Sequence, residues 1–226
     1  MKKVVIFFGA PSSGKGTQAD LLLKKFGFYH FDTGKYGEQI LHDPEKLKNK
    51  INRRERKNFD AGLLFTPSWT LKLVSEKTKE LARAGLKIVF SGSPRTLYEA
   101  FGDKKVPGLF SVLEKEYGKK NIAILFIKTN SDTSIFRNIN RLVCSVCATP
   151  VMYQKGIKIK NCLLCGGHLK KRIFDNPEKM KVRLNEYKTR TEPIFAQLKK
   201  RGYNMKTING EKLPFEMFEE VKKKIN

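Results

Sequence analysis

The chain has 226 residues, about 1.5 times the usual length of one domain, which excludes a tiny disulfide scaffold and predicts one large domain or a core with inserted lobes. Its 46 basic and 22 acidic side chains leave a net charge of +24, which invites a polyanionic partner. Because 35 of the basic residues are Lys and only 11 are Arg, the charge is more typical of solvated faces than of a nucleic-acid groove.

The apolar amino-terminal stretch, residues 4–8, is too short for a signal peptide because it meets Gly9, Pro11 and Lys15. The longest apolar run, residues 122–127, has six residues, against about 20 needed to cross a bilayer. We therefore expect a cytoplasmic chain without a membrane segment or membrane partner. In such a chain, four cysteines indicate a metal site or free thiols rather than two disulfides.

Five short apolar runs predict buried strands. They are residues 4–8, 28–31, 87–90, 122–128 and 204–208. Helical patterns fill most of the intervals, including residues 67–85 and 177–201, each opened by a proline after a capping residue. Strands that alternate with helices predict an α/β fold with a parallel sheet wrapped by helices.

Two stretches interrupt this alternation. Residues 35–60 are polar and Lys-rich with helical character, whereas residues 137–174 contain all four cysteines and little helical periodicity. We interpret both as lobes inserted into the α/β core.

A phosphate-binding loop is the strongest local signal. Residues 9–15, Gly-Ala-Pro-Ser-Ser-Gly-Lys, fit the pattern G-x-x-x-x-G-K and lie between a predicted strand and a helix that runs to Phe26. The glycines let backbone N–H groups turn toward phosphate oxygens, the helix amino terminus adds partial positive charge, and Lys15 supplies a mobile cation. The Ser or Thr expected after the lysine is displaced by one position, to Thr17.

Residues 9–18 of this loop and helix resemble adenylate kinases and related nucleoside monophosphate kinases, and the resemblance extends over nearly the whole chain. Four further motifs support the resemblance. Thr33-Gly34 resembles the start of the family's monophosphate lobe, and Asp60-Ala61-Gly62 with Thr66 resembles the end of that lobe. Gly92-Ser93-Pro94-Arg95-Thr96 is similar to the family's Gly-Phe-Pro-Arg-Thr loop, and residues 183–187 resemble the stretch that follows the family's lid.

The resemblance implies a P-loop core with a five-stranded parallel sheet over residues 1–32, 67–136 and 175–226, a monophosphate-binding lobe over 33–66 and a zinc lid over 137–174. It implies a monomer that uses magnesium to transfer a phosphoryl group from ATP to AMP, giving two ADP. Two alternatives stay open: a kinase for UMP, CMP or dTMP, and a degenerate P-loop protein that binds RNA. The basic residues interleaved with aromatics that would favour RNA are not evident.

Phosphoryl transfer depends on positioning and on forked cations that stabilise charge on the moving group. By resemblance, the catalytic residues are Lys15, Arg95, Arg137, Arg141, Arg172 and Arg183. The implied ATP-binding residues are Ser12, Ser13, Gly14, Lys15, Gly16, Thr17, Arg137, Arg141 and Lys212, with the base near Arg137 and the turn at 209–212. The implied AMP-binding residues are Thr33, Leu63, Leu64, Phe65, Gly92, Arg95, Glu99, Arg172 and Arg183.

The four cysteines form two knuckles, Cys144-x-x-Cys147 and Cys162-x-x-Cys165, with 14 residues between them. This spacing favours tetrahedral zinc, with iron, no metal or disulfides as alternatives. The same arrangement occurs in the zinc-bearing lid of some bacterial adenylate kinases. Because a lobe of 38 residues does not readily build its own core, the ion is expected to replace one, with His168 outside the ligand set.

The chain departs from the family pattern close to the chemistry. Ser91 stands where an Asp usually orients magnesium-bound water, which predicts weaker magnesium handling. Glu38 replaces a second monophosphate-binding Arg, with Lys35 as a candidate for compensation. Glu99 stands in place of a Gln that commonly reads adenine, which bears on base selectivity. Phe174 stands in place of the first residue of an Asp pair, of which Asp175 keeps the second, and this departure bears on lid closure.

Overall fold

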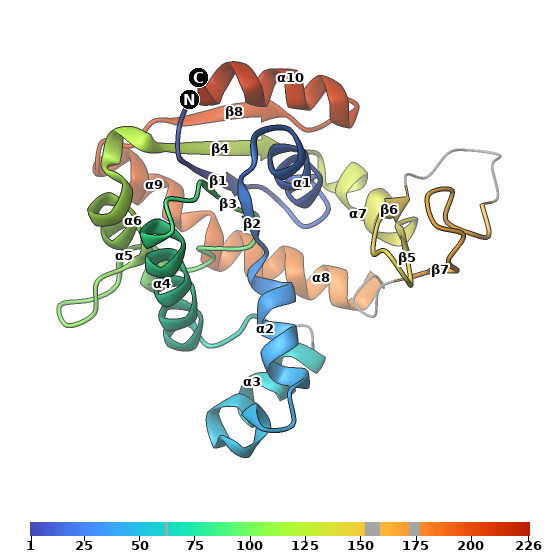
Figure 1. Cartoon of the computed structure of the whole chain (residues 1–226), viewed down its shortest axis with the longest axis horizontal. Helices are drawn as coiled ribbons and strands as arrows, with labels where there is room; N and C mark the ends of the chain where they lie inside the picture. The colour runs from blue at the N-terminus through green and yellow to red at the C-terminus, as the bar shows by residue number, and fades with distance from the viewer. Residues whose placement is uncertain (62, 152–158, 172–176) are drawn as a thin grey trace.

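A five-stranded parallel sheet forms the centre of the computed structural model, which describes residues 1–61, 63–151, 159–171 and 177–226 (Figure 1). The strand order is β2-β3-β1-β4-β8. The strands are β1 (Val4–Phe8), β2 (Tyr29–Phe31), β3 (Ile88–Phe90), β4 (Ile122–Lys128) and β8 (Met205–Asn209). All five predicted strands are present with ends shifted by at most one residue, so the α/β fold class is confirmed.

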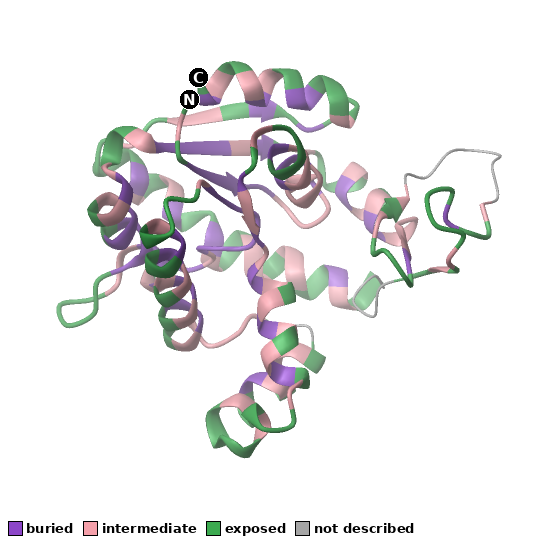
Figure 2. Ribbon diagram, in the orientation of Figure 1, coloured by how far each residue is buried: buried purple, intermediate pink, exposed green. Residues whose placement is uncertain are grey.

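Two helical layers cover both faces of the sheet, and Figure 2 shows the inner strands β1, β3 and β4 largely buried between them. In β1, Val4, Ile6 and Phe8 pack with one layer, whereas Val5 and Phe7 pack with the other. The first layer contains α4 (Pro67–Arg83), α6 (Leu109–Tyr117) and α9 (Pro193–Lys200), and the second contains α1 (Lys15–Phe26) and α10 (Pro214–Ile225). This double burial explains why β1 is apolar without interruption.

The carboxyl ends of the strands define where a ligand site can form. The chain leaves β1 toward β2 and β3 on one side, while β4 pairs with β1 on its other side. Strand order therefore reverses at β1, and open α/β sheets bind ligands at such a switch point. The loops after β1 and β3 and the turn after β2 meet at this edge.

Two excursions extend from the core (Figure 1). The first contains α2 (Thr33–His42), a 3₁₀ turn (Lys46–Lys48) and α3 (Lys50–Asp60). The second is a three-stranded antiparallel sheet of β5 (Leu142–Cys144), β6 (Pro150–Val151) and β7 (Leu169–Lys170), set between α7 (Ser131–Ile139) and α8 (Pro177–Glu186). The remaining elements are α5 (Leu97–Phe101), a 3₁₀ turn (Lys119–Asn121) and a π-helical turn (Tyr187–Thr191).

Two of the helix predictions need correction. The helix expected over 177–201 is divided into α8, the π-helical turn and α9, because Pro193 lacks the N–H that a continuous helix needs, and Glu192 N donates to the Tyr187 carbonyl instead (3.0 Å). The helix expected over 67–85 ends at Arg83, with Gly85 in a left-handed conformation. Thr66 precedes this helix without a side-chain capping bond; its backbone N–H donates to the buried Glu55 carboxylate at 2.7 Å.

No helix in the described parts of the chain combines the length and the apolar composition needed to cross a membrane.

Candidate active site

The backbone conformation of the loop between β1 and α1 requires glycine at two positions. Gly9 has φ +150°, and a Cβ there would lie 2.7 Å from the Ile127 carbonyl oxygen and from Ser13 Oγ. Gly14, at the amino end of α1, has φ +104°. The Lys15 ammonium donates to the carbonyls of Gly9 and Ala10, each at 2.7 Å, so it lies across the concave side of the loop.

Positively charged side chains act on the ammonium of Lys15 from several parts of the chain. Burial, followed by the positive charges of Arg95, Arg183 and Arg141, lowers the pKa of Lys15 to about 7. These arginines follow β3, lie on α8 and follow α7, respectively. The structure therefore brings three of the predicted catalytic arginines to the lysine of the loop. Several positive charges around a buried amine repel one another, and a bound polyanion offsets that repulsion.

Helix α7 is attached to the same loop. Asn138 Nδ2 donates to Ser12 Oγ at 3.1 Å, and the Ser134 hydroxyl donates to the Pro11 carbonyl. Arg137 donates to the Gly210 carbonyl at 2.7 Å, so it lies beside the 209–212 turn. Lys212, in contrast, pairs with Glu220 of α10 at 2.8 Å.

A small pocket lies where the loop after β3 meets α2, α4 and α5. Its lining residues in the described structure are Thr33, Gly34, Leu64, Phe65, Thr70, Gly92, Arg95 and Glu99. Six of them were predicted to bind AMP. Gly34 and Thr70 were missed; Gly34 belongs to the Thr-Gly motif, whereas no sequence signal marks Thr70. Leu63 is exposed and does not line the pocket, and Arg172 lies outside the described residues.

The pocket is built by motifs that are 60 residues apart in the chain. Thr33 Oγ1 donates to Ser93 Oγ at 2.8 Å, and a Cβ on Gly92 would lie 3.2 Å from Thr33 N, so glycine permits this close approach. Asp32 caps α2 by accepting from the Gly34 and Lys35 N–H groups. Arg95 Nε donates to the Gly92 carbonyl at 2.7 Å, which sets the direction of the guanidinium.

Glu99 is buried beneath this pocket, where its carboxylate accepts from Arg95 N (2.8 Å) and Thr96 Oγ1 (3.2 Å). Burial raises its pKa to about 7 despite these hydrogen bonds. Its side chain is therefore partly protonated near neutral pH, which allows it to donate a hydrogen bond as well as to accept one.

The aromatic floor of the pocket depends on a glycine. The Phe65 ring stacks on Phe59 (centroids 5.8 Å apart) and contacts Trp69 (4.9 Å). A Cβ on Gly37 would lie 2.5 Å from the Phe65 ring, so this position of α2 leaves room for the ring. Glu38, the next residue, is half-buried and does not line the pocket.

A chain of side chains that sequence reasoning missed ends at Ser91. Its Oγ lies 2.7 Å from Nε2 of His30, and His30 Nδ1 lies 2.7 Å from the Asp20 carboxylate. Partial burial raises the pKa of Asp20, but the hydrogen bond and charge of His30 outweigh it and lower that pKa overall. Asp20 and His30 come from α1 and β2, and no motif relates them in the sequence.

The four cysteines form a compact cluster in the β5-β6-β7 lobe. Their sulfurs all lie within 4.8 Å of one another, and none is in a disulfide. Backbone N–H groups of Cys147 and Val146 donate to Cys144 Sγ at 3.4 and 3.3 Å and lower the pKa of Cys144. A Cβ on Gly167 would lie 2.9 Å from the same sulfur. This donor set could hold a metal ion, and His168 is exposed outside it.

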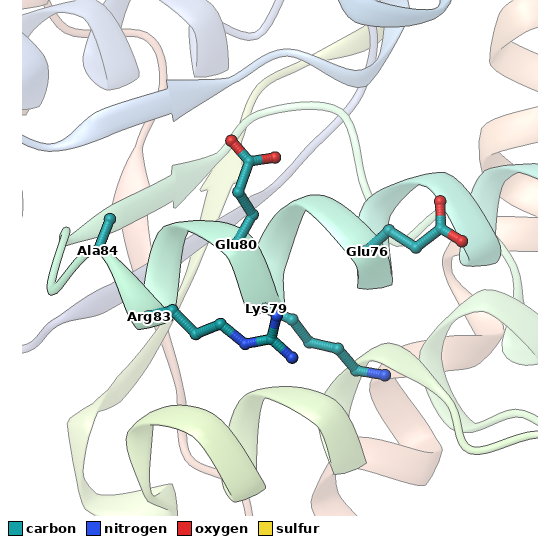
Figure 3. Close-up of a pocket in the computed structure, with 5 residues that line it drawn as sticks. All are labelled: Glu76, Lys79, Glu80, Arg83 and Ala84. Atoms are coloured by element: carbon teal, nitrogen blue, oxygen red, sulfur yellow. The ribbon is translucent and has the colours of Figure 1, made fainter.

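A second hollow runs along one side of α4 (Figure 3). Its lining residues are Glu76, Lys79, Glu80, Arg83 and Ala84. They come from α4 and from Ala84, the residue that follows it, so no polar groups converge there from different elements. It is not a candidate active site.

Comparisons with known proteins agree with this geometry. The family model described as adenylate kinase matches residues 7–203. An adenylate kinase of Elusimicrobium minutum is 31% identical over 226 residues, covering 99% of this chain and 98% of the relative. One of Caldicellulosiruptor bescii is 32% identical over 201 residues, covering 88% and 87%. The chain therefore belongs to the adenylate kinase family, the enzymes that transfer a phosphoryl group from ATP to AMP and yield two ADP.

Proposed function

We propose that the two nucleotides meet at Lys15, with ATP phosphates on the 9–17 loop and AMP in the pocket lined by Thr33 and Arg95. The observation that carries this assignment is the effect of Arg95, Arg141 and Arg183 on the pKa of Lys15. Such cations act on the charge that spreads over the phosphoryl oxygens during transfer. Neither RNA binding nor transfer to another monophosphate is favoured by the family.

On the donor side, backbone N–H groups of Ser12, Gly14 and Gly16 would face the ATP phosphates, whereas the Ser13 N–H donates to the Ala10 carbonyl (3.2 Å) and Ser13 would contribute its side chain. Arg137, held by the Gly210 carbonyl, would lie near the base, and Lys212 would contribute only after leaving Glu220. Adenylate kinases use magnesium with ATP, and the ion neutralises phosphate charge when bound. The hydroxyl of Thr17, in the first turn of α1, suits this hard cation, which otherwise keeps phosphate and water ligands.

On the acceptor side, Arg95 would grip the AMP phosphate and Thr33 would contact the nucleotide from the amino end of α2. Glu99, partly protonated near pH 7, would offer adenine both a donor and an acceptor, which a Gln at this position would also do. We therefore propose that Glu99 retains adenine recognition. Leu64 and Phe65 close this side of the pocket, and Leu63 and Arg172 stay predictions from the resemblance.

We also propose the expected division into a core (1–32, 67–136 and 175–226), a monophosphate lobe (33–66) and a lid (137–174). The separate three-stranded sheet and the α2–α3 excursion support it. Closure of the two lobes would exclude water as a competing acceptor. Because one chain supplies all the proposed residues, we propose that the enzyme acts as a monomer.

Substitution Arg95→Ala tests the acceptor assignment. We expect kcat/KM for AMP to fall by about 100 to 1000-fold, the usual effect of removing one preorganised charge contact, with a smaller change in the KM for ATP. Steady-state rates with each nucleotide varied in turn measure this difference. Arg53→Ala, on the exposed face of α3, is the matched control. A normal kcat/KM for AMP in Arg95→Ala would exclude the assignment.

We propose that the cysteine cluster holds structural zinc. Four thiolate donors within 4.8 Å suit tetrahedral zinc, and the N–H groups directed at Cys144 stabilise a thiolate there. The backbone at Gly167 lies too close to Cys144 Sγ for a larger residue, as expected where two cysteine loops pack around one ion. In this lobe the ion would replace a hydrophobic core.

Elemental analysis should find one zinc per chain, and chelation should raise hydrogen exchange in the lobe before the core, because the lobe depends on the ion. Cys147→Ser should lose zinc, whereas His168→Ala should keep it. Protein prepared with zinc that contains no metal, or that contains oxidised cysteine pairs, would contradict the proposal.

We propose that Ser91 orients magnesium-bound water through a neutral hydrogen bond, with His30 and Asp20 fixing the direction of its hydroxyl. A serine contributes no negative charge, so the magnesium requirement should be high. Ser91→Asp should lower the magnesium concentration that gives half the maximal rate. His30 lies close enough to pair with the new carboxylate, so the melting temperature should not fall.

Magnesium titrations and thermal melts of wild type and Ser91→Asp provide the test, with the exposed Ser111→Asp as a control for added charge. An unchanged magnesium midpoint together with a lower melting temperature would show that Ser91 has only a structural role.

A further inference from the structure

More than half of the net charge of the chain lies in six short stretches at one end of the molecule. The stretches are residues 2–3, 23–27, 80–87, 114–121, 197–206 and 222–226, which together hold sixteen basic and three acidic side chains in 38 residues. They therefore contribute +13 of the total +24. We call this end, defined by these six stretches, the basic pole.

The fold brings the six stretches together. Strands β1, β3, β4 and β8 begin in or beside them, and helices α1, α4, α6, α9 and α10 end in them, as Figure 1 shows for the adjacent chain ends. Hydrogen bonds connect them: Lys2 N to Ile225 O (2.6 Å), Lys2 Nζ to Lys120 O (2.6 Å), Lys119 Nζ to Arg201 O (2.8 Å), Lys206 Nζ to Lys224 O (2.9 Å), Tyr117 Oη to Leu86 O (3.0 Å) and Lys87 Nζ to Phe26 O.

Helix capping accounts for only part of this charge. A helix carboxyl terminus carries about half a negative charge, so five of them offset roughly 2.5 positive charges. Eleven of the sixteen basic side chains are exposed. Among them, the side chains of Lys25, Lys115, Lys199, Lys200 and Lys223 form no hydrogen bond or ion pair with described residues. A surplus of this size favours association with a polyanion.

We propose that the basic pole docks the enzyme on an anionic lipid bilayer. Of the sixteen basic residues, 14 are Lys and two are Arg, so forked contacts that read nucleic acid are scarce. None of the three aromatic residues in these stretches, Phe26, Tyr117 and Tyr203, is exposed for stacking on bases. Two exposed leucines, Leu23 and Leu86, lie among the lysines instead, a mixture typical of membrane interfaces.

The shape of the basic pole agrees with a planar partner. A sheet between two helical layers presents an end about 30 Å across, since each layer is about 10 Å thick. A bilayer surface contacts all of this end at once, and each lysine near the surface adds to the attraction. The loops after β1 and β3 lie at the opposite ends of the strands, so nucleotides reach them from the side away from the bilayer.

The test measures partition of the full chain onto vesicles of phosphatidylcholine alone and of phosphatidylcholine with phosphatidylglycerol. The variant Lys199→Gln, Lys200→Gln, Lys223→Gln removes three exposed charges from the basic pole. The matched control Lys72→Gln, Lys104→Gln, Lys105→Gln removes three exposed charges from α4 and from the loop after α5, outside the basic pole. Both variants should keep the wild-type kinase rate, which shows that they fold.

Wild type and control should bind the anionic vesicles only, and binding should weaken as salt is added. The basic pole variant should bind about 100-fold more weakly, because each lysine contributes about fivefold. Equal losses in the two triple variants, or no preference for anionic vesicles, would overturn the proposal. So would tighter binding to double-stranded RNA than to the vesicles, if it depends on the same three lysines.

Discussion

The burial of Lys15 among arginines is the constraint on which the site depends. The loop wraps the ammonium in its own carbonyls, and Arg95, Arg141 and Arg183 act on it from three other parts of the chain. Cations held at such proximity repel one another unless phosphates lie between them. The fold thus maintains a charge arrangement that suits the phosphates of the two nucleotides proposed to meet there.

The parallel sheet supplies the rigidity that this arrangement needs. With β1 buried on both faces, the loop that follows it has a fixed origin, and the β3 loop is tied to α2 through the Thr33–Ser93 hydrogen bond. The excursions contribute no strand to the central sheet, so the closure proposed for them would leave the strand pairing of that sheet unchanged.

Sequence reasoning succeeded where the signal was local. Periodicity predicted the five strands, and cysteine spacing predicted a cluster that could hold a metal ion. Six of the pocket residues came from the family resemblance, and their contacts with AMP stay predictions. It missed His30 and Asp20, since their contact with Ser91 depends on how β2 and α1 pack beside β3. It interpreted the lysines as spread over solvated faces, because only the parallel topology places six distant stretches at one end. Sequence reasoning also missed the π-helical turn at 187–191, which forms just before Pro193 interrupts the helix.

Proton uptake on nucleotide binding tests the charge arrangement most directly. The pKa of Lys15 is about 7 without a ligand, so at pH 8 the amine is mostly neutral, and a bound polyphosphate should raise its pKa and charge it. Calorimetric titration with ADP at pH 8, in buffers of different ionisation enthalpy, should show uptake of about one proton. Lys15→Arg stays charged and should abolish the uptake, whereas Glu99→Gln should retain it. Binding heats that do not depend on the buffer in the wild-type enzyme would contradict the account.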